Sequence, residues 1–469
     1  MEQSKTRLTA RQQFFVATML FGMFFGAGNL IFPIYMGHLA GRNMWSAVAG
    51  FLVTGVGLPL LGVAALGISR AGGLQEMSSR VSRGYSLFFT CALYLTIGPF
   101  FAIPRCASTS FTVGIAPLLG RESGTGVLLA VFSVAFFGAV LAFSLKPGNI
   151  LTWVGKVLTP LFLLVLAILL ITAMVSPVDT IHSVAPAAAY ETSPFFTGFL
   201  DGYNTMDALA SLAFGIVVIN VIRELGVTKP GAVAANTVKS GVISCIFMGV
   251  IYLAVTIVGA QSSSLIAHCG NGGEGLAVIA EHYLGRAGLV VLALTVLLAC
   301  LKTAVGLVTS CAETFVGLFP KGPGYRAWAV IFSVVSLLIA NIGLDAIISW
   351  SLPVLMLLFP LAITLILLAL FGRLYDYDPT VYRWVTGLTL AAALLDFMKA
   401  LPEGLSSTAF VRTVVECAEH TLPLFSIGLG WACPAAVGAV IGLTLLHTYL
   451  AVVGLQLRQL LESQGHAHL

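Results

Sequence analysis

The chain has 469 residues, of which 58% are hydrophobic and only 9% are charged, and its formal net charge is +4 at pH 7. Apolar runs of about 20 residues, the length that a helix needs to cross the hydrocarbon of a bilayer, recur along the sequence. The composition excludes a water-soluble protein and predicts a polytopic α-helical membrane protein. We expect such a protein to contact lipids, and we expect no nucleic-acid partner and no cofactor. The eight cysteines include no CxxC pair, which argues against a metal cluster or a redox motif.

Twelve apolar segments are expected to cross the membrane. The first continues well past the length of a signal-peptide core and lacks a small-residue cleavage pattern, so we expect it to be a span. In chain order the predicted spans are 12–37, 44–68, 84–118, 124–143, 150–174, 195–222, 240–260, 287–318, 327–341, 346–370, 384–399 and 433–456.

The loops differ strongly in Lys and Arg content. With the N-terminus inside, the cytoplasmic side carries 15 of these residues and the outer side carries 5, while Arg105, Lys156 and Lys302 lie within spans. Because positive residues resist translocation, this bias places both termini in the cytoplasm. The loops 175–194 and 261–285 contain acidic residues and no Lys or Arg, which agrees with an outer location.

The first span is interrupted at its centre. The stretch FFGAGNLIFP, residues 24–33, places Gly26, Gly28 and Asn29 where a helix would be weak. An unpaired backbone group in hydrocarbon costs several kcal/mol, so irregular backbone at this depth survives only where it lines a cavity or meets a ligand. The alternative is plain helix packing, because Gly22 and Gly26 form a GxxxG pattern.

A second interruption lies in the span 195–222. The sequence FLDGYNTMDALASLAFG places Asp201, Gly202, Asn204, Thr205 and Asp207 inside an apolar segment, about 175 residues after the first break. Carboxylates inside a membrane are costly and are by default functional. Two broken spans at this spacing are typical of an inverted-repeat transporter. In such a transporter the N–H groups at the half-helix N-termini bind a carboxylate, and the carbonyls that lack helical partners bind a cation or an ammonium.

Five longer stretches carry a family resemblance: GMFFGAGNLIFP (22–33), LTIGPFFAIPR (95–105), SFTVGIAPL (110–118), GYNTMDALASLAFGIVV (202–218) and LDFMKA (395–400). They resemble the branched-chain amino acid:cation symporters, the transport system II carrier proteins of bacteria, over nearly the whole chain. The resemblance implies uptake of leucine, isoleucine and valine with a co-transported cation, usually sodium, across a bacterial inner membrane.

The same resemblance implies a five-plus-five inverted repeat of the leucine-transporter type, with discontinuous helices 1 and 6. We expect one transmembrane domain over 1–456, followed by a cytoplasmic tail over 457–469. Its first repeat would cover about 12–174 and its second about 195–370, and two extra helices would lie within about 384–456.

The substrate site is expected at the two breaks. The N–H groups of Gly28 and Asn29 would face the substrate carboxylate, and carbonyls near Gly202 and Tyr203 would receive its ammonium. Asp207 either adds negative charge there or only caps the second half-helix.

The apolar side chain of the substrate needs an apolar slot, for which Met206 and residues near Phe101 are candidates, unless they are ordinary packing residues. The predicted substrate-binding residues are Gly26, Ala27, Gly28, Asn29, Gly202, Tyr203, Thr205, Met206 and Asp207.

A sodium ion prefers hard oxygen ligands, which the side chains of Asn29 and Thr205 could offer. In related sodium transporters a further cation site uses carbonyls of the first span and a carbonyl and hydroxyls of the eighth. The resulting Na⁺ candidates are Gly22, Phe25, Asn29, Ala299 and Thr303.

Lys302 departs from the family pattern at this cation site. Its ammonium either occupies the place of the cation or carries protons, so the coupling ion is left open between Na⁺ and H⁺. In the competing interpretation, Lys302 points into a water-filled vestibule and pairs with a carboxylate such as Asp201. Arg105 also has two interpretations, as a gate for the outer vestibule or as an anchor at the headgroups.

Other classes of function fit less well. A membrane-embedded enzyme would need a nucleophile or a metal set, and neither HExxH nor GxSxG occurs. A channel would show a re-entrant filter or rings of charge. The remaining alternative is a permease of the same fold for another small amino acid or a nucleobase, with or without a coupling cation.

Overall fold

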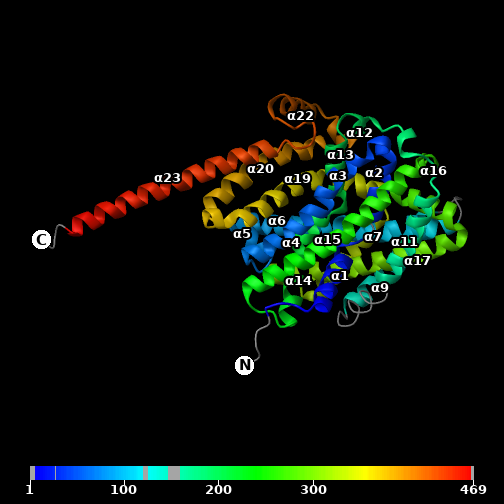
Figure 1. Cartoon of the computed structure of the whole chain (residues 1–469), viewed down its shortest axis with the longest axis horizontal. Coiled ribbons are helices and arrows are strands. Elements are labelled where there is room, and N and C mark those ends of the chain that lie inside the picture. The colour runs from blue at the N-terminus through cyan, green and yellow to red at the C-terminus, as the bar shows by residue number, and fades with distance from the viewer. Residues whose placement is uncertain (1–5, 27, 120–124, 146–158, 466–469) are drawn as a thin grey trace.

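The computed structural model describes residues 6–26, 28–119, 125–145 and 159–465, and these ranges contain helices and turns but no β-strand (Figure 1). Ala27, and residues 150–158 of the fifth predicted span, lie outside the described residues. The helices pack into one bundle, from which the last helix, α23 (Ala432–Gly465), extends away after packing against α20 (Pro379–Lys399) (Figure 1).

Within the described ranges, eight helical stretches are long and apolar enough to cross a membrane, and one bent pair makes a ninth. One of the eight, residues 28–69, joins half of the first predicted span to the second. Two shorter apolar helices, Leu163–Val175 and Tyr325–Ala340, fall within the fifth and ninth predicted spans. Every predicted span therefore contains helix, which confirms the all-helical membrane fold.

The break in the first span is confirmed. Helix α1 (Ala10–Phe24) begins with a capping box between Thr9 and Gln12 and ends at Phe24. Phe25 is extended, with ψ of 98°, and α2 (Gly28–Ala40) begins three residues later. The first N–H groups of α2 and the last carbonyls of α1 therefore lie at the middle of the span without regular helical partners.

The break in the sixth span is confirmed as well. Helix α13 (Pro194–Asp201) leads into a single 3₁₀ turn, η7 (Gly202–Thr205), and α14 (Asp207–Glu224) follows at an angle of 44° to the preceding segment. Met206 joins them with φ of 61°, in the left-handed region. A side chain with a Cβ is disfavoured there, and such residues concentrate at functional sites.

The remaining helices surround the two broken spans. In the first half they are η1 (Gly41–Asn43), α3 (Met44–Leu52), η2 (Val53–Gly57), α4 (Leu58–Ser69), α5 (Leu74–Ser79), α6 (Arg83–Leu95), η3 (Thr96–Phe100), α7 (Ala102–Thr109), η4 (Ser110–Ile115), α8 (Ala116–Leu119), α9 (Thr125–Ser144) and α11 (Thr159–Val175). In the second half they are η6 (Ile181–Ser183), α12 (Ala188–Thr192), α15 (Pro230–Gln261), α16 (Ser263–Ile266), α17 (Gly272–Leu318), α18 (Tyr325–Ala340), α19 (Leu344–Phe371), η8 (Gly372–Tyr375), α21 (Glu403–Ser406) and α22 (Ala409–Thr421).

Paired glycines bring the half-helices close to their neighbours. A Cβ on Gly37 of α2 would lie 2.1 Å from the Thr256 carbonyl of α15, and one on Gly259 would lie 2.0 Å from the Ile34 carbonyl. Helices α13 and α3 make the same reciprocal contact through Gly198 and Gly50. Small residues permit this close approach inside a membrane bundle. The equivalent contacts in the two halves fit an inverted repeat, in which α2 with α15 corresponds to α13 with α3.

Candidate functional site

The two breaks face one small cavity in the middle of the bundle, with a volume of about 40 Å³. Both broken spans contribute to its wall, together with η3, α7 and α17. The predicted residues that line it are Gly26, Gly28, Asn29, Thr205, Met206, Asp207 and Thr303.

Asn29 and Asp207 join the two breaks by hydrogen bonds. The Asn29 Nδ2 donates to Asp207 Oδ2 at 2.7 Å and also to the Tyr252 hydroxyl of α15. The Tyr252 hydroxyl donates to the same Asp207 oxygen at 2.6 Å, and Asn29 Oδ1 accepts from the Gly26 N–H at 2.8 Å. All three side chains are buried, so this network fixes the relative position of the first and sixth spans.

The network decides between the two interpretations of Asp207. It is the first residue of α14, yet its carboxylate makes no capping bond to that helix. It bonds across the break to Asn29 and Tyr252, which a capping role alone does not explain. The positive end of the α14 dipole still favours the negative charge at this position. Tyr252 was missed by sequence reasoning, because nothing local marks a tyrosine in a continuous apolar helix.

Arg105 contributes a positive charge to the cavity. It is only 4% exposed, its Nη1 donates to the Asn204 carbonyl at 2.8 Å, and its guanidinium lies over the Phe32 ring at 5.1 Å. A Cβ on Gly28 would lie 2.9 Å from Arg105 Nη2, so the guanidinium is beside the N-terminus of α2. The interpretation of Arg105 as a headgroup anchor is wrong.

The backbone of the third span explains the inward position of Arg105. Gly98 has non-helical angles, φ −95° and ψ −125°, and Pro99 follows it, so the chain bends before α7. Ile97 and Ala102 line the cavity, whereas the predicted candidate Phe101 does not. An arginine in a span, between one and two turns after a Gly-Pro pair, is the signal that could have located this residue at the site.

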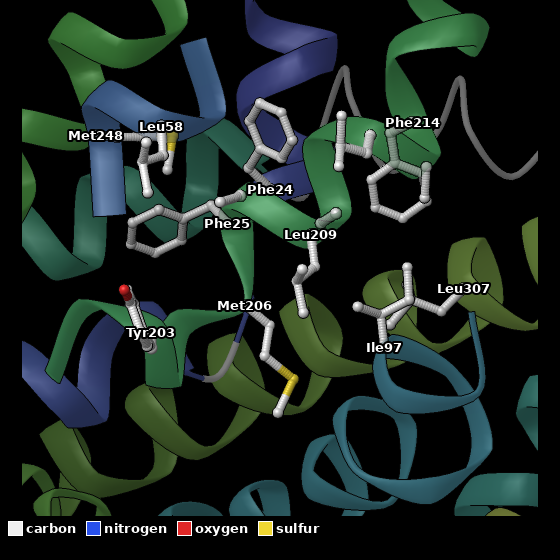
Figure 2. Packing of buried hydrophobic residues seen from close by; sticks show 14 of the residues in the cluster. Phe24, Phe25, Leu58, Ile97, Tyr203, Met206, Leu209, Phe214, Met248 and Leu307 are labelled. Carbon is white, nitrogen blue, oxygen red and sulfur yellow. The ribbon is translucent and has the colours of Figure 1, made fainter. Parts of the chain in front are cut away.

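The apolar wall is formed by side chains from four spans. Figure 2 shows Phe24, Ile97, Phe214 and Leu307 around Met206, with Tyr203 on the other side of Met206 from Ile97 and Leu307. Ala102, next to the predicted Phe101, belongs to this wall, which also includes residues that sequence reasoning did not assign: Met23, Phe24, Ile97, Cys106, Ala210, Phe214 and Leu307.

Gly202 and Tyr203 lie beside the cavity rather than in its wall. A Cβ on Gly202 would lie 1.9 Å from Thr54 Oγ1, and the Tyr203 ring stacks on Phe359 with centroids 4.0 Å apart. The Gly202 carbonyl accepts from Thr205 Oγ1 at 2.9 Å, and the Tyr203 carbonyl accepts from the Met206 N–H at 3.0 Å. Each carbonyl keeps a second lone pair, so ammonium binding there stays a prediction.

The sodium candidates lie at the end of α1 and on α17. The Gly26 N–H, which in a continuous helix would bond to the Gly22 carbonyl, donates to Asn29 instead. Thr303 faces this break, with its Cγ2 3.3 Å from a Cβ placed on Gly26, and its hydroxyl donates to the Ala299 carbonyl at 3.1 Å.

The remaining predictions concern Phe25 as a sodium ligand and Lys302 as a charge beside the cation site. Phe25 is the C-cap of α1, and Lys302 is half-buried next to Thr303 without lining the cavity. Asp201, its suggested alternative partner, accepts a hydrogen bond from the Tyr190 hydroxyl and lines a different cavity.

Residues 9–448 match the family model described as branched-chain amino acid transport protein. The chain belongs to this family. It is 52% identical over 435 residues to the branched-chain amino acid permease BrnQ of Lactobacillus delbrueckii subsp. lactis, covering 92% of this chain and 96% of that one. It is 40% identical to BrnQ of Bacillus subtilis, covering 93% and 97% of the two chains, and 40% identical to the branched-chain amino acid transport system 2 carrier protein of Pseudomonas aeruginosa, covering 90% and 93%. The relatives are transport proteins and not enzymes.

Two solved structures share the fold of this transport protein. Mhp1, a nucleobase-cation-symport-1 family transporter in a closed conformation with bromovinylhydantoin bound, superposes with a TM-score of 0.59 at 15% identity, over 94% of this chain and 93% of that one. MhsT in complex with L-phenylalanine gives a TM-score of 0.52 at 13% identity, over 92% and 99%. The predicted leucine-transporter fold, with its discontinuous helices 1 and 6, is therefore confirmed.

Proposed function

We propose that the protein imports leucine, isoleucine and valine across a bacterial inner membrane by cation-coupled symport, with alternating access to the central cavity. The observation that carries the proposal is the pair of opposite charges in the cavity wall, Arg105 and Asp207. A zwitterionic amino acid brings a carboxylate and an ammonium that match them. A neutral nucleobase carries no charge that matches either group, so it would gain nothing from the two charges in the wall.

The wall of the cavity gives each part of the amino acid a position. The carboxylate would lie between the Arg105 guanidinium and the N–H groups of Gly28 and Asn29, because a helix N-terminus and a guanidinium both attract anions. The ammonium would lie on the side of Asp207 and the η7 carbonyls. The branched side chain would pack against the apolar wall around Met206.

The cavity is too small in this conformation to exchange an amino acid with either side. A volume of about 40 Å³ is in the range that holds a few water molecules. Transport therefore requires the half-helices to separate from their neighbours on one side at a time. The turn at Met206 and the break after Phe24 are the positions at which the spans can bend without breaking regular helical hydrogen bonds.

The coupling ion is proposed to bind next to the first break. The carbonyls of Gly22, Phe25 and Ala299 and the hydroxyl of Thr303 supply hard oxygen ligands suited to sodium, and Asn29 links that place to the substrate. Lys302, beside Thr303, supports the alternative in which its ammonium replaces the ion or carries the coupling proton. The excess of Lys and Arg in alternate loops supports an orientation with both termini in the cytoplasm.

Uptake of labelled leucine into proteoliposomes tests the proposal. An imposed sodium or proton gradient should drive leucine accumulation, and isoleucine and valine should compete while alanine and nucleobases compete weakly. Accumulation driven by neither gradient would contradict symport, and stronger competition by a nucleobase would contradict the substrate class. Lys302→Thr should change the ion dependence, and an unchanged dependence would eliminate Lys302 as a substitute for the cation.

A further inference from the structure

Two cysteine thiols from different spans meet at the wall of the central cavity. Cys106 of α7 belongs to that wall, and Cys300 of α17 is fully buried. The two thiols are reduced and are hydrogen-bonded to each other. Helices α7 and α17 pack side by side (Figure 1), so this contact connects the third predicted span to the eighth.

Ser110 fixes the orientation of the two thiols. Its hydroxyl donates to the Cys106 carbonyl at 2.7 Å, and the Cys300 thiol is hydrogen-bonded to the same hydroxyl. A serine hydroxyl has one proton, which the carbonyl accepts, so the S–H of Cys300 donates to Ser110 Oγ. The Cys300 sulfur then accepts from the S–H of Cys106. This chain of hydrogen bonds keeps the two sulfur atoms facing each other.

Two other buried cysteines have different surroundings. Cys245 donates to the Val56 carbonyl at 3.4 Å. Cys311 donates to the Tyr94 carbonyl, also at 3.4 Å. Each of these thiols is paired with a backbone group of a neighbouring span, as expected for a small packing residue. Packing explains these two thiols, whereas two sulfur atoms in contact can also form a bond with each other.

The thiol pair lies between the groups proposed to hold the substrate and the coupling ion. Arg105, which precedes Cys106, is beside the N-terminus of α2. Cys300 follows the proposed cation ligand Ala299 and lies one turn before Thr303. A disulfide bond is about 2.0 Å long, which is shorter than the separation of two hydrogen-bonded thiols, so its formation would draw α7 and α17 together. That shift would move Arg105 and Thr303 relative to the cavity.

We propose that Cys106 and Cys300 are an oxidation site, at which peroxide forms a disulfide that weakens leucine binding in the central cavity. The effect on leucine rests on the proposed function. Hydrogen peroxide is close to water in size, and a cavity of about 40 Å³ holds a few water molecules, so peroxide fits beside Cys106 even when the cavity is closed to an amino acid.

The reaction needs no reagent besides the peroxide. The Cys106 sulfur attacks one peroxide oxygen, the O–O bond breaks, and one water leaves, which gives the sulfenic acid of Cys106. The Cys300 sulfur then attacks the Cys106 sulfur, the S–O bond breaks, and a second water leaves. The peroxide gains two electrons and the two thiols lose them, and both thiol protons end in the two water molecules.

Peptide mapping by mass spectrometry tests the oxidation site. The purified full chain in lipid nanodiscs is treated with hydrogen peroxide, and the remaining thiols are blocked with N-ethylmaleimide before digestion. We expect a peptide pair linked through Cys106 and Cys300, and no such pair in Cys106→Ser or Cys300→Ser. Cys417→Ser is the matched control, because Cys417 is exposed on α22, and it should still form the link. Absence of the linked pair in the unmodified chain would overturn the proposal.

Initial rates of leucine uptake in proteoliposomes test the effect on the substrate. A displacement of about 1 Å at a site can cost about 100-fold, so we expect peroxide to raise the KM for leucine at least about tenfold. Dithiothreitol should restore the KM, and Cys106→Ser and Cys300→Ser should each keep the KM of their untreated form. Met206 lines the same cavity, but methionine sulfoxide is reduced by dedicated enzymes. A loss that persists after dithiothreitol would therefore indicate methionine oxidation and overturn the proposed effect.

The outcomes separate the oxidation site from the proposed function. A linked peptide pair with an unchanged KM, or equal peroxide sensitivity in both serine variants, overturns the effect on leucine and leaves the proposed function intact. No leucine uptake by the untreated protein contradicts the proposed function, while the linked peptide pair still decides whether Cys106 and Cys300 are an oxidation site.

Discussion

Two buried aspartates show different uses of a carboxylate inside the same bundle. Asp207 accepts hydrogen bonds from Asn29 at 2.7 Å and Tyr252 at 2.6 Å and faces a cavity of about 40 Å³. Asp396 makes no hydrogen bond of normal geometry in the described residues, and both of its carboxylate oxygens are buried. The comparison teaches that a carboxylate hydrogen-bonded to two other spans fixes how those spans pack, whereas one without such bonds adds no constraint of this kind.

The Asp207 site should be the more sensitive to mutation. Asn29→Ala removes the donor to Asp207 and the acceptor of the Gly26 N–H. Losing a hydrogen bond to a charged group costs about 1.5–3 kcal/mol, and about 1.4 kcal/mol is tenfold, so we expect the initial rate of leucine uptake in proteoliposomes to fall about 10- to 100-fold. Asn341→Ala is the control, since Asn341 is exposed and bonds only to its own helix within the described residues. A fall of less than about threefold, near the range of a neutral surface change, would show that the network does not organise the site.

The second-largest effect is expected at Arg105, which supplies the positive charge of the central site. Arg105→Lys keeps the charge but loses the planar guanidinium, so we expect the KM for leucine to rise about tenfold. Leucinol, which lacks the carboxylate, serves as the discriminating inhibitor. Its inhibition constant should be nearly the same in both proteins if Arg105 contacts the carboxylate, and an equal rise for leucinol would show that Arg105 only supports the fold.

Asp396 should affect transport less, because it lies outside the central cavity. For Asp396→Asn, which keeps the shape of the side chain, we expect the initial rate of leucine uptake to fall by no more than about threefold at every leucine concentration. Concentration series of initial rates provide the measurement. A loss as large as that of Asn29→Ala would place Asp396 in the central transport step and remove the contrast with Asp207.

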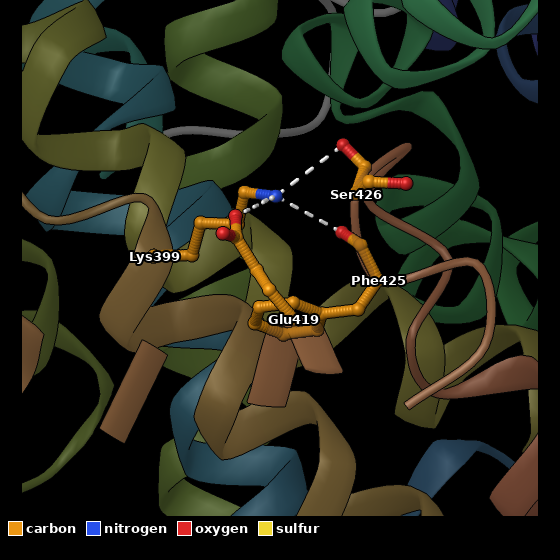
Figure 3. A network of polar contacts seen from close by, with 4 residues as sticks. All are labelled: Lys399, Glu419, Phe425 and Ser426. Carbon is orange, nitrogen blue, oxygen red and sulfur yellow. Dashed lines mark hydrogen bonds and ion pairs between the residues drawn. The ribbon is translucent and has the colours of Figure 1, made fainter. Parts of the chain in front are cut away.

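The smallest effect is expected at Lys399. Its pair with Glu419 is partly exposed, and such pairs contribute little (Figure 3). Lys399 also donates to the carbonyls of Phe425 and Ser426, so Lys399→Met should loosen that segment, and we expect the initial rate of leucine uptake to change by no more than about twofold. Lys399→Arg, which can still donate to the carbonyls, should leave the rate unchanged. A loss as large as that of Asn29→Ala would mean that Lys399 takes part in the transport step.

Sequence reasoning located the breaks well. Glycine and asparagine at the centre of an apolar run, and carboxylates in a second run, are local signals, and the helices end at Phe24 and restart at Gly28 and Asp207. The same reasoning missed Tyr252. It also assigned no role to Asp396, although the stretch LDFMKA (395–400), which contains Asp396, was recognised as a family motif. It left Arg105 open between a gate and a headgroup anchor, because the position of its side chain depends on the bend at Gly98 and not on its position in the apolar run.

The sequence by itself determined that the chain crosses the membrane many times and that two of its spans are broken, because hydrophobic length and helix-breaking residues act locally. Only the tertiary structure decided which groups meet: Asn29 with Asp207 across 178 positions, and Arg105 with the Asn204 carbonyl. The physical reason is that hydrogen-bond satisfaction inside a bundle is a property of packed neighbours from different spans, which no single segment encodes.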